Sequence, residues 1–350
     1  MVAIPRIAVT MGDPAGVGPE IIAKAAQRLK DRIEAGELAL VVTGSGHRLA
    51  AACAGLGIAQ PFAAVSADTP LEALPPCALV EVGPDASAIE PGKVSAVAGE
   101  SAYQAIAAGV RMAMGGLVDA ICTAPINKEA LNLAGHHYSG HTELLADLTA
   151  ARNSVMMLAH GNMRVSHVCT HVALRDVPKR LTPERLRQVV ELTADALNRL
   201  GIARPRIGIA ALNPHAGENG LFGREDIDIT APTVEDLRRA GHDVTGPVPG
   251  DTIFVKLRAG QFDAVVAMYH DQGHIPVKLL GFSVDPTTGE WQALSGVNVT
   301  LGLPIIRTSV DHGTAFDIAG KGIASEQSLL EAIDYAVQLA QGSDRTAPSP

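Results

Sequence analysis

Three apolar, strand-like runs in this sequence each end in a histidine: residues 164–171, 207–215 and 264–270. The carboxyl ends of parallel strands lie along one edge of a sheet, so His171, His215 and His270 are predicted to converge there. Neutral imidazole binds zinc and similar divalent ions, and three protein ligands leave a coordination position open for a substrate oxygen. The pattern therefore predicts a catalytic metal site. The alternative for any one of these histidines is a strand cap.

Turn-like segments are expected to hold two of these histidines at loop mouths. Residues 213–217 read Asn-Pro-His-Ala-Gly and residues 270–273 read His-Asp-Gln-Gly, and both are typical of turns. Asp271 directly follows His270, so its carboxylate is a candidate to orient the imidazole as an outer-shell partner.

A second group of residues is suited to an anionic substrate. His141 and Thr142 open a predicted helix, whose amino terminus favours a phosphate or carboxylate; an ordinary helix cap is the alternative. Lys278, Asn298 and Arg307 stand at the edges of apolar runs, where a cation suits a phosphorylated or carboxylated substrate. Surface charges or structural ion pairs are the alternative for these three.

A glycine-rich turn follows the first apolar run, at residues 11–20. Its spacing matches neither the dinucleotide fingerprint nor a phosphate-binding P-loop, so a tight turn and a ligand loop remain equally open.

Alternating strands and helices must position these residues. Strands are predicted near 6–11, 38–43, 78–82, 118–123, 154–159, 164–170, 206–212, 263–269 and 296–309. Helices are predicted near 18–30, 46–56, 94–115, 182–200, 233–240, 251–259 and 326–341. The alternation is typical of an α/β fold with a largely parallel sheet, and Gly161-Asn162 predicts one local hairpin. With 350 residues, two α/β lobes over 1–342 are expected, with a disordered tail at 343–350.

Composition restricts the classes of partner. A net charge of -9 and a pI near 5.7 argue against nucleic acid and anionic membranes. The four cysteines form no C-x-x-C pair, and neither a secretion signal nor a membrane-spanning run is visible. A cytoplasmic protein is therefore expected.

Several ordered segments resemble the 4-hydroxythreonine-4-phosphate dehydrogenase (PdxA) family over nearly the whole chain. They are residues 11–20, 123–128, 140–143, 212–218, 268–273 and 296–304. The resemblance implies that His171, His215 and His270 bind a divalent metal. It also implies that His141, Thr142, Lys278, Asn298 and Arg307 bind the substrate and its phosphate.

A shorter similarity, over residues 312–322, is to the isopropylmalate and isocitrate dehydrogenases. It implies that NAD or NADP lies near this loop, with His312, Gly313, Thr314, Ala315 and Asp317 as cofactor-binding residues. The implied fold is the two-lobed α/β/α sandwich of those enzymes with an interlobe active-site cleft. In the PdxA family the metal ligands come from both subunits of a homodimer, so a homodimer with shared active sites is implied here.

The implied reaction is a metal-assisted, NAD(P)-linked oxidation of the C3 hydroxyl of 4-hydroxy-L-threonine 4-phosphate, followed by decarboxylation to 3-amino-2-oxopropyl phosphate. Lys278, Asp271 or a metal-bound hydroxide is the expected proton acceptor. Zinc, magnesium, manganese and cobalt all remain open as the metal.

Two departures from the biosynthetic pattern, at 274–276 and 283–291, resemble the catabolic branch of the family instead. That branch oxidises 4-phospho-D-threonate or 4-phospho-D-erythronate, giving dihydroxyacetone phosphate and CO2. The rival classes are a metal-dependent phosphohydrolase and a non-catalytic binding protein on an old enzyme fold, and the loop at 312–322 argues against the hydrolase.

Overall fold

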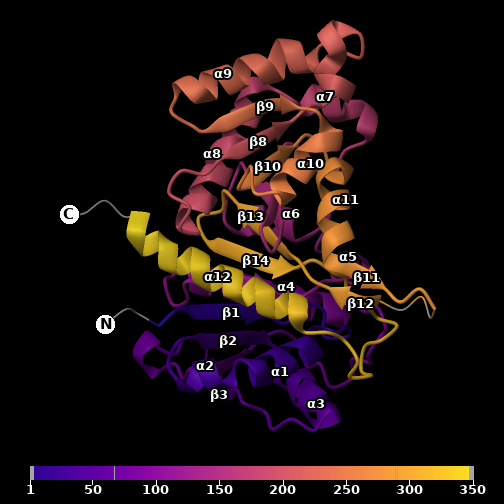
Figure 1. Ribbon diagram of the computed structural model, residues 1–350. Helices are drawn as coiled ribbons and strands as arrows, with labels where there is room; N and C mark the ends of the chain where they lie inside the picture. The colour runs from indigo at the N-terminus through magenta and orange to yellow at the C-terminus, as the bar shows by residue number, and fades with distance from the viewer. Residues whose placement is uncertain (1–3, 67, 288, 290, 347–350) are drawn as a thin grey trace. The chain divides into compact units, whose positions relative to one another are not determined.

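The chain divides into two compact units in the computed structural model, which describes residues 4–66, 68–287, 289 and 291–346. Unit 1 comprises Met1–Ser154 and Leu303–Gln341, and unit 2 comprises Val155–Gly302 and Gly342–Pro350. The indigo beginning of the chain and most of the yellow helix near its end thus belong to the same unit (Figure 1).

Unit 1 is a parallel sheet with helices packed on it. Its strands are β1 (Arg6–Thr10), β2 (Ala39–Gly44), β3 (Ala63–Val65), β4 (Cys77–Glu81), β5 (Ala120–Thr123) and β14 (Ile306–Val310), in the order β3-β4-β2-β1-β5-β14. Each neighbouring pair is parallel. The helical segments are α1 (Gly18–Arg28), α2 (Lys30–Glu34), α3 (Gly46–Leu56), η1 (Leu71–Ala73), α4 (Ala96–Met114), α5 (Lys128–Leu133), α6 (His141–Leu148) and α12 (Gln327–Thr346).

Sequence signals account for these elements locally. The Ser45 hydroxyl accepts a hydrogen bond from the Arg48 amide at the start of α3, and Gly57 ends that helix at φ 65°. α4 buries Ile106 and Val110 against strand residues such as Ile121. Burying each such side chain contributes about 1.5–3 kcal/mol, which fixes α4 on one face of the sheet.

The strand order places a topological switch point in unit 1 between β1 and β5. The chain leaves β1 for β2 on one side, and β5 later adds on the other side. In open α/β sheets ligands bind where the loops after two such strands diverge, at the carboxyl edge. The loops that follow β1 and β5 therefore lie at the position where this class of fold binds ligands.

Unit 2 is a mixed sheet in the order β13-β6-β7-β10-β8-β9. Its strands are β6 (Val155–His160), β7 (Met163–His167), β8 (Ile207–Ala210), β9 (Val244–Val248), β10 (Ala264–Ala267) and β13 (Val297–Leu301), beside a hairpin of β11 (Phe282–Val284) and β12 (Trp291–Leu294). The helical segments are η2 (Leu174–Asp176), α7 (Val177–Arg180), α8 (Pro183–Arg199), η3 (Pro214–Gly220), η4 (Asp226–Thr230), α9 (Ala231–Arg239), α10 (Gly250–Arg258) and α11 (His270–Gly281).

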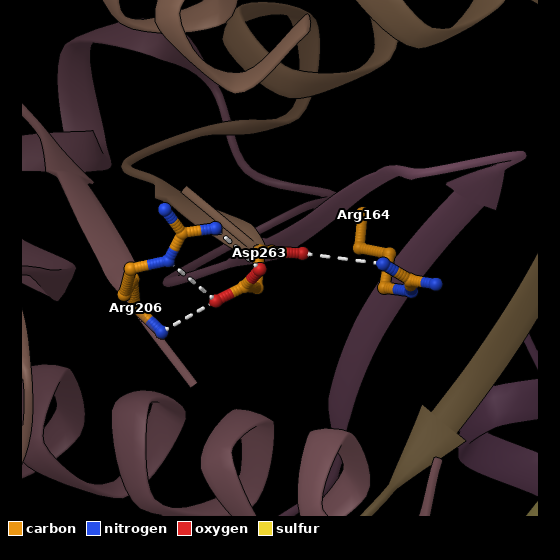
Figure 2. A network of polar contacts seen from close by, with 3 residues as sticks. All are labelled: Arg164, Arg206 and Asp263. Atoms are coloured by element: carbon orange, nitrogen blue, oxygen red, sulfur yellow. Dashed lines mark hydrogen bonds and ion pairs between the residues drawn. The ribbon is translucent and has the colours of Figure 1, made fainter. Parts of the chain in front are cut away.

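Within unit 2, β7, β10, β8 and β9 run parallel. The carboxyl ends of β7, β8 and β10 precede His171, His215 and His270 respectively. The opposite edge is held by an ion pair: Arg206 Nη2 donates to Asp263 Oδ1 at 2.9 Å, and the Arg206 amide donates to Asp263 Oδ2 at 2.8 Å. Figure 2 shows this fork, with Arg164 reaching the Asp263 carbonyl. It ties the starts of β8 and β10 together, which sets the register of the strands that lead to His215 and His270.

The α/β prediction is confirmed, and so is the hairpin at Gly161-Asn162, where β6 and β7 pair antiparallel. Two predictions of local structure are wrong. The single strand expected at 296–309 is two strands, β13 and β14, in different units. The turn expected at 270–273 is the first turn of α11, because the helix continues through Pro276.

The expected tail at 343–350 overlaps α12, which ends at Thr346, and residues 347–350 lie outside the described residues. Among the helices that the structure describes, none combines the length and apolar character needed to cross a bilayer.

Candidate functional site

Two of the three predicted metal-binding histidines lie side by side in unit 2. His171 follows β7 in a loop and His270 begins α11, and their ring centroids are 5.9 Å apart. With a zinc–nitrogen distance of about 2.0 Å, two imidazoles on one ion have centroids roughly 5–6 Å apart. The His270 Nδ1–H donates to Asp271 Oδ1 at 2.7 Å, which leaves Nε2 as the ligand atom. This pair of donors fits a borderline divalent ion.

His215 lies in a strained turn of unit 2. Residues 215–219 all have positive φ, between 42° and 84°, so that this part of η3 turns in the left-handed sense. Such a conformation costs roughly 1–2 kcal/mol per non-glycine residue and persists only where neighbouring groups hold it. The buried Asp226 carboxylate anchors the chain just before this turn, because it accepts the amides of Leu212 at 2.9 Å and Asn213 at 2.8 Å. The aromatic ring beside His215 is that of Phe222, at 6.4 Å.

The side chain of Gln272 joins the loops that carry His215 and His270. Its Oε1 accepts the Met268 amide at 2.7 Å, and its Nε2 donates to the Ala211 carbonyl at 2.8 Å. Even so, within the described part of this chain no three His, Cys, Asp or Glu side chains are arranged to hold a metal ion. The assignment of His171, His215 and His270 to one ion stays a prediction.

Two further histidines join this part of unit 2, and the sequence interpretation gave neither a role in the site. His274 stacks on His270 with ring centroids 3.6 Å apart, and His167 lies 4.8 Å from His274. Burial lowers the pKa of His167 to about 4 and that of His274 to about 3. Both rings are therefore neutral at neutral pH and place no positive charge beside His270. The spacing of four residues between His270 and His274 could have indicated this contact, because residues one helical turn apart are neighbours on a helix. That argument works only if the segment is first recognised as the helix α11.

Arg307 and His141 form the polar group of unit 1. Arg307, on β14, is 2% exposed, and its Nη2 donates to the Thr123 hydroxyl at 2.7 Å. Burial lowers the pKa of Arg307 to about 10, an effect opposed by Cys122. Burial and then the charge of Arg307 hold the pKa of His141 well below its usual range, while a hydrogen bond to the Ala124 backbone works in the other direction.

The side chains of Arg307 and His141 offer hydrogen-bonding groups that suit a polar ligand. The Nε2 atom of His141 is buried and has no hydrogen-bond partner among the described residues. A neutral imidazole bonded to a backbone carbonyl through Nδ1 presents an acceptor at Nε2. The pair therefore offers a cation for a phosphate or carboxylate and an acceptor for a hydroxyl group.

The remaining predicted substrate residues occupy separate elements. Thr142 lies in the first turn of α6, and Asn298 lies on β13 opposite Leu158 of β6. Lys278 is on α11, with its Nζ 4.8 Å from the centre of the Phe282 ring in a cation–π contact. His270, His274 and Lys278 follow one another at intervals of four residues, so they lie along one face of α11.

The loop 312–322 packs on the glycine-rich turn of unit 1. The Val17 amide donates to the Thr314 carbonyl at 3.0 Å, and the Glu20 carboxylate accepts the amides of Gly320 and Gly322. Gly16 is required here, because a Cβ would lie 2.9 Å from the Thr314 carbonyl oxygen. Residues 11–20 are buried throughout, so the turn holds the neighbouring loop in place, which favours the tight-turn interpretation. In the loop itself Gly313 and Asp317 are exposed, while His312, Thr314 and Ala315 are half-buried.

Asp13 is a buried carboxylate within this turn. One oxygen accepts the Ala15 amide at 2.8 Å, whereas Oδ2 has no hydrogen-bond partner among the described residues. Burial raises the pKa of Asp13 from 3.8 to about 6, and the Ala15 hydrogen bond only partly opposes this. The folded protein therefore binds a proton at Asp13 more tightly than the unfolded chain does, and ionising this group costs stability.

An Asp13→Asn variant is expected to have a different pH dependence of unfolding. Because the pKa of Asp13 is raised in the folded protein, its contribution to the unfolding free energy is fully present below about pH 4. That contribution is lost as the pH rises from there through about 6, where Asp13 ionises in the folded protein. Asparagine does not titrate, so the unfolding free energy of the variant should gain about 2 kcal/mol on that of the wild type between pH 4.5 and pH 7. Urea unfolding of both proteins across this range measures it. Parallel curves would contradict the assignment of the buried charge to Asp13.

The chain matches known proteins over most of its length. The family model for "Pyridoxal phosphate biosynthetic protein PdxA" matches residues 35–336. A protein of Bradyrhizobium diazoefficiens, "Putative D-threonate 4-phosphate dehydrogenase", is 66% identical, over 97% of each chain. The 4-hydroxythreonine-4-phosphate dehydrogenase of Beijerinckia indica is 45% identical, over 95% of this chain and 94% of that protein.

The same relationship appears among solved structures. The crystal structure of 4-hydroxythreonine-4-phosphate dehydrogenase from Klebsiella pneumoniae is 44% identical and superposes with a TM-score of 0.78, over 96% of this chain and 98% of that chain. The prediction of an oxidoreductase that acts on a CH–OH group is thereby confirmed. On this agreement of sequence and fold, the chain belongs to the PdxA family of dehydrogenases.

Proposed function

We propose that the protein oxidises the C3 hydroxyl of D-threonate 4-phosphate with NAD or NADP and a divalent metal, and that loss of CO2 then gives dihydroxyacetone phosphate. The observation that carries the choice of substrate is the 66% identity to the Bradyrhizobium diazoefficiens protein named for that compound, against 45% to the relative named for 4-hydroxythreonine 4-phosphate. The biosynthetic reaction on 4-hydroxy-L-threonine 4-phosphate is the second candidate, and D-erythronate 4-phosphate is a variant of the first.

Arg307 is proposed to bind the phosphate group of this substrate. The Arg307 guanidinium is buried away from water, so a phosphate dianion would stabilise its charge. Its paired N–H groups also match the geometry of two phosphate oxygens. His141 beside it is proposed to accept a hydrogen bond from a substrate hydroxyl, and Thr142 to donate from the start of α6. Lys278 and Asn298 complete the proposed substrate set.

The metal is proposed to bind His270 and His171 through imidazole nitrogens, with His215 as the third ligand. A bound divalent ion supplies positive charge beside the oxygen that becomes negative during the reaction. Asp271 orients His270 and fixes its tautomer. Lys278, on the same face of α11, is the proposed proton acceptor, because Asp271 is engaged with His270. Imidazole ligands favour zinc over magnesium, with manganese and cobalt as further candidates.

The nicotinamide dinucleotide is proposed to bind the loop 312–322. The backbone of Gly313 is exposed, and the exposed Asp317 carboxylate suits ribose hydroxyl groups. The loop amides that donate to Glu20, and the Val17 amide that donates to the Thr314 carbonyl, fix the loop before the cofactor arrives, which lowers the entropic cost of binding. His312, Thr314 and Ala315 are the other proposed contacts.

A second copy of the chain is proposed to cover α11. Ile275 and Leu279 are 63% and 78% exposed and lie one turn apart on this helix, and Trp291 of the nearby hairpin is 63% exposed. Clustered apolar side chains of this size commonly mark a protein interface. Ligands shared between two copies would also reconcile the proposed three-histidine site with the arrangement found in one chain.

The Leu279→Glu variant is therefore expected to be monomeric, since a carboxylate would be desolvated at the interface. Light scattering on a sizing column measures the mass. Val255→Glu, at a similarly exposed position on α10, is the control and should leave the mass of a dimer unchanged. A wild type that runs as a monomer at micromolar concentration would contradict the proposed dimer.

The decisive experiment for the function is reduction of NAD or NADP by the purified protein. D-threonate 4-phosphate and 4-hydroxy-L-threonine 4-phosphate are supplied in parallel, before and after chelation and repletion with zinc, magnesium, manganese or cobalt. Faster metal-dependent turnover of the threonate supports the proposal, and faster turnover of the amino acid supports the second candidate. A folded protein that turns over neither substrate with any metal would overturn both.

A further inference from the structure

His274 lies directly against the proposed metal ligand His270. The two rings stack with nearly parallel planes: their centroids are 3.6 Å apart and the angle between the planes is 14°. His274 is itself fixed: it is 8% exposed, and its Nδ1–H donates to the carbonyl of His270 at 2.9 Å. A rotation of the His274 ring would break this hydrogen bond, so the ring presents a rigid flat surface to His270.

His167 supports His274 from the core of unit 2. This residue ends β7, is 1% exposed, and donates from Nδ1 to the Met156 carbonyl at 3.2 Å. Its ring lies 4.8 Å from that of His274, at 47°. Gly273 makes the contact possible, because a Cβ at that position would lie 2.3 Å from His167 Nε2. The packed rings of His167 and His274 therefore connect β7 of the sheet to the ring of His270.

From this geometry we infer that His274, backed by His167, is a positioning residue that holds the ring plane of His270 for metal binding. The inference rests on the proposed role of His270 as a ligand. Asp271 contacts the edge of the His270 ring and sets which nitrogen carries the proton. A single hydrogen bond still lets the His270 ring rotate about the line that joins Nδ1 to the carboxylate oxygen. The stacked face of His274 removes that freedom. His274 is not proposed to touch the metal or the substrate.

Affinity for Co²⁺ tests the inference without any turnover. The apparent Kd is measured on the purified, metal-free protein by competition with a chromogenic chelator, and the visible d–d bands of the Co²⁺ protein report the ligand geometry. His274→Leu removes the flat ring and is expected to weaken Co²⁺ binding about 10- to 100-fold and to change the d–d bands. His274→Phe keeps a ring and should bind within about threefold of the wild type.

Two controls separate positioning from a loss of structure. His242→Ala, in the turn before β9 of the same unit, should leave Co²⁺ affinity and spectrum unchanged. Thermal unfolding of every variant checks the fold. Should the leucine variant not fold, His274→Gln replaces it, because glutamine is polar but offers no ring: weakened binding with Gln and normal binding with Phe supports the inference, and normal binding with both overturns it.

The outcomes distinguish the inference from the proposed function. His270→Ala should abolish the Co²⁺ spectrum; if it does not, His270 is no ligand and the proposed metal site fails. If His270→Ala does abolish the spectrum while His274→Leu binds Co²⁺ as the wild type does, the metal site stands and the positioning role of His274 is overturned. Equal weakening in the Phe and Leu variants would also overturn the stacking role.

Discussion

Replacing His270 by alanine is expected to lower kcat/KM for D-threonate 4-phosphate by about three orders of magnitude or more. The variant loses the nitrogen that Asp271 leaves available for the metal and, with it, the stacking contact of His274. Positive charge beside the reacting oxygen is worth several kcal/mol, and each tenfold in rate corresponds to about 1.4 kcal/mol. Initial rates at saturating NAD or NADP, with metal content measured on the same samples, give the result.

The substitution Asp271→Asn serves as a graded comparison. It keeps the size of the side chain at 271 but removes the carboxylate charge that orients His270, so a loss of about 10- to 100-fold in metal affinity is expected. A His270→Ala protein that retains both its metal and its rate would show that His270 takes no part in the reaction.

Replacing Arg307 by methionine is expected to lower kcat/KM for the phosphorylated substrate by about 10²- to 10³-fold, mainly through KM. Loss of one partner from a buried, hydrogen-bonded charge pair costs 2–5 kcal/mol or more. The stability of the fold should not decrease, because burying the Arg307 cation costs desolvation energy. Methionine has no charge, so the variant does not have this cost. The melting temperature of Arg307→Met is therefore expected to equal or exceed that of the wild type.

The unphosphorylated D-threonate identifies the group that Arg307 binds. If Arg307 binds the phosphate, omitting the phosphate and removing the guanidinium are not additive, and Arg307→Met changes turnover of D-threonate little. An equal loss with both compounds would place Arg307 elsewhere in the reaction. Lysine at this position keeps the charge but not the fork and should recover only part of the rate.

Much of the architecture could be predicted because strand and helix periods are local. β1 and β2 were predicted within a residue or two, since β-branched runs separated by amphipathic segments leave few alternatives. α11 was missed for an equally local reason: Gly273 and Pro276 both disfavour a helix interior. Tertiary packing overrides that preference, since Gly273 is needed for the approach of His167.

The candidate site divides in the same way. Residue types and motif spacing identified His171, His270 and Arg307 as candidates, and they also indicated the family. They did not reveal that His274 stacks on His270, that Asp226 anchors the chain just before the turn that carries His215, or that Glu20 holds the loop at 312–322.

The sequence by itself determined the α/β class, the family resemblance and the chemical identity of the proposed ligands, because these depend on residue type and on spacing along the chain. Only the tertiary structure decided which side chains support those ligands. The contacts between His167 and His274 and between Arg307 and Thr123 join residues more than 100 positions apart. Packing of the sheets and helices brings such pairs together, and no local pattern in the sequence encodes them.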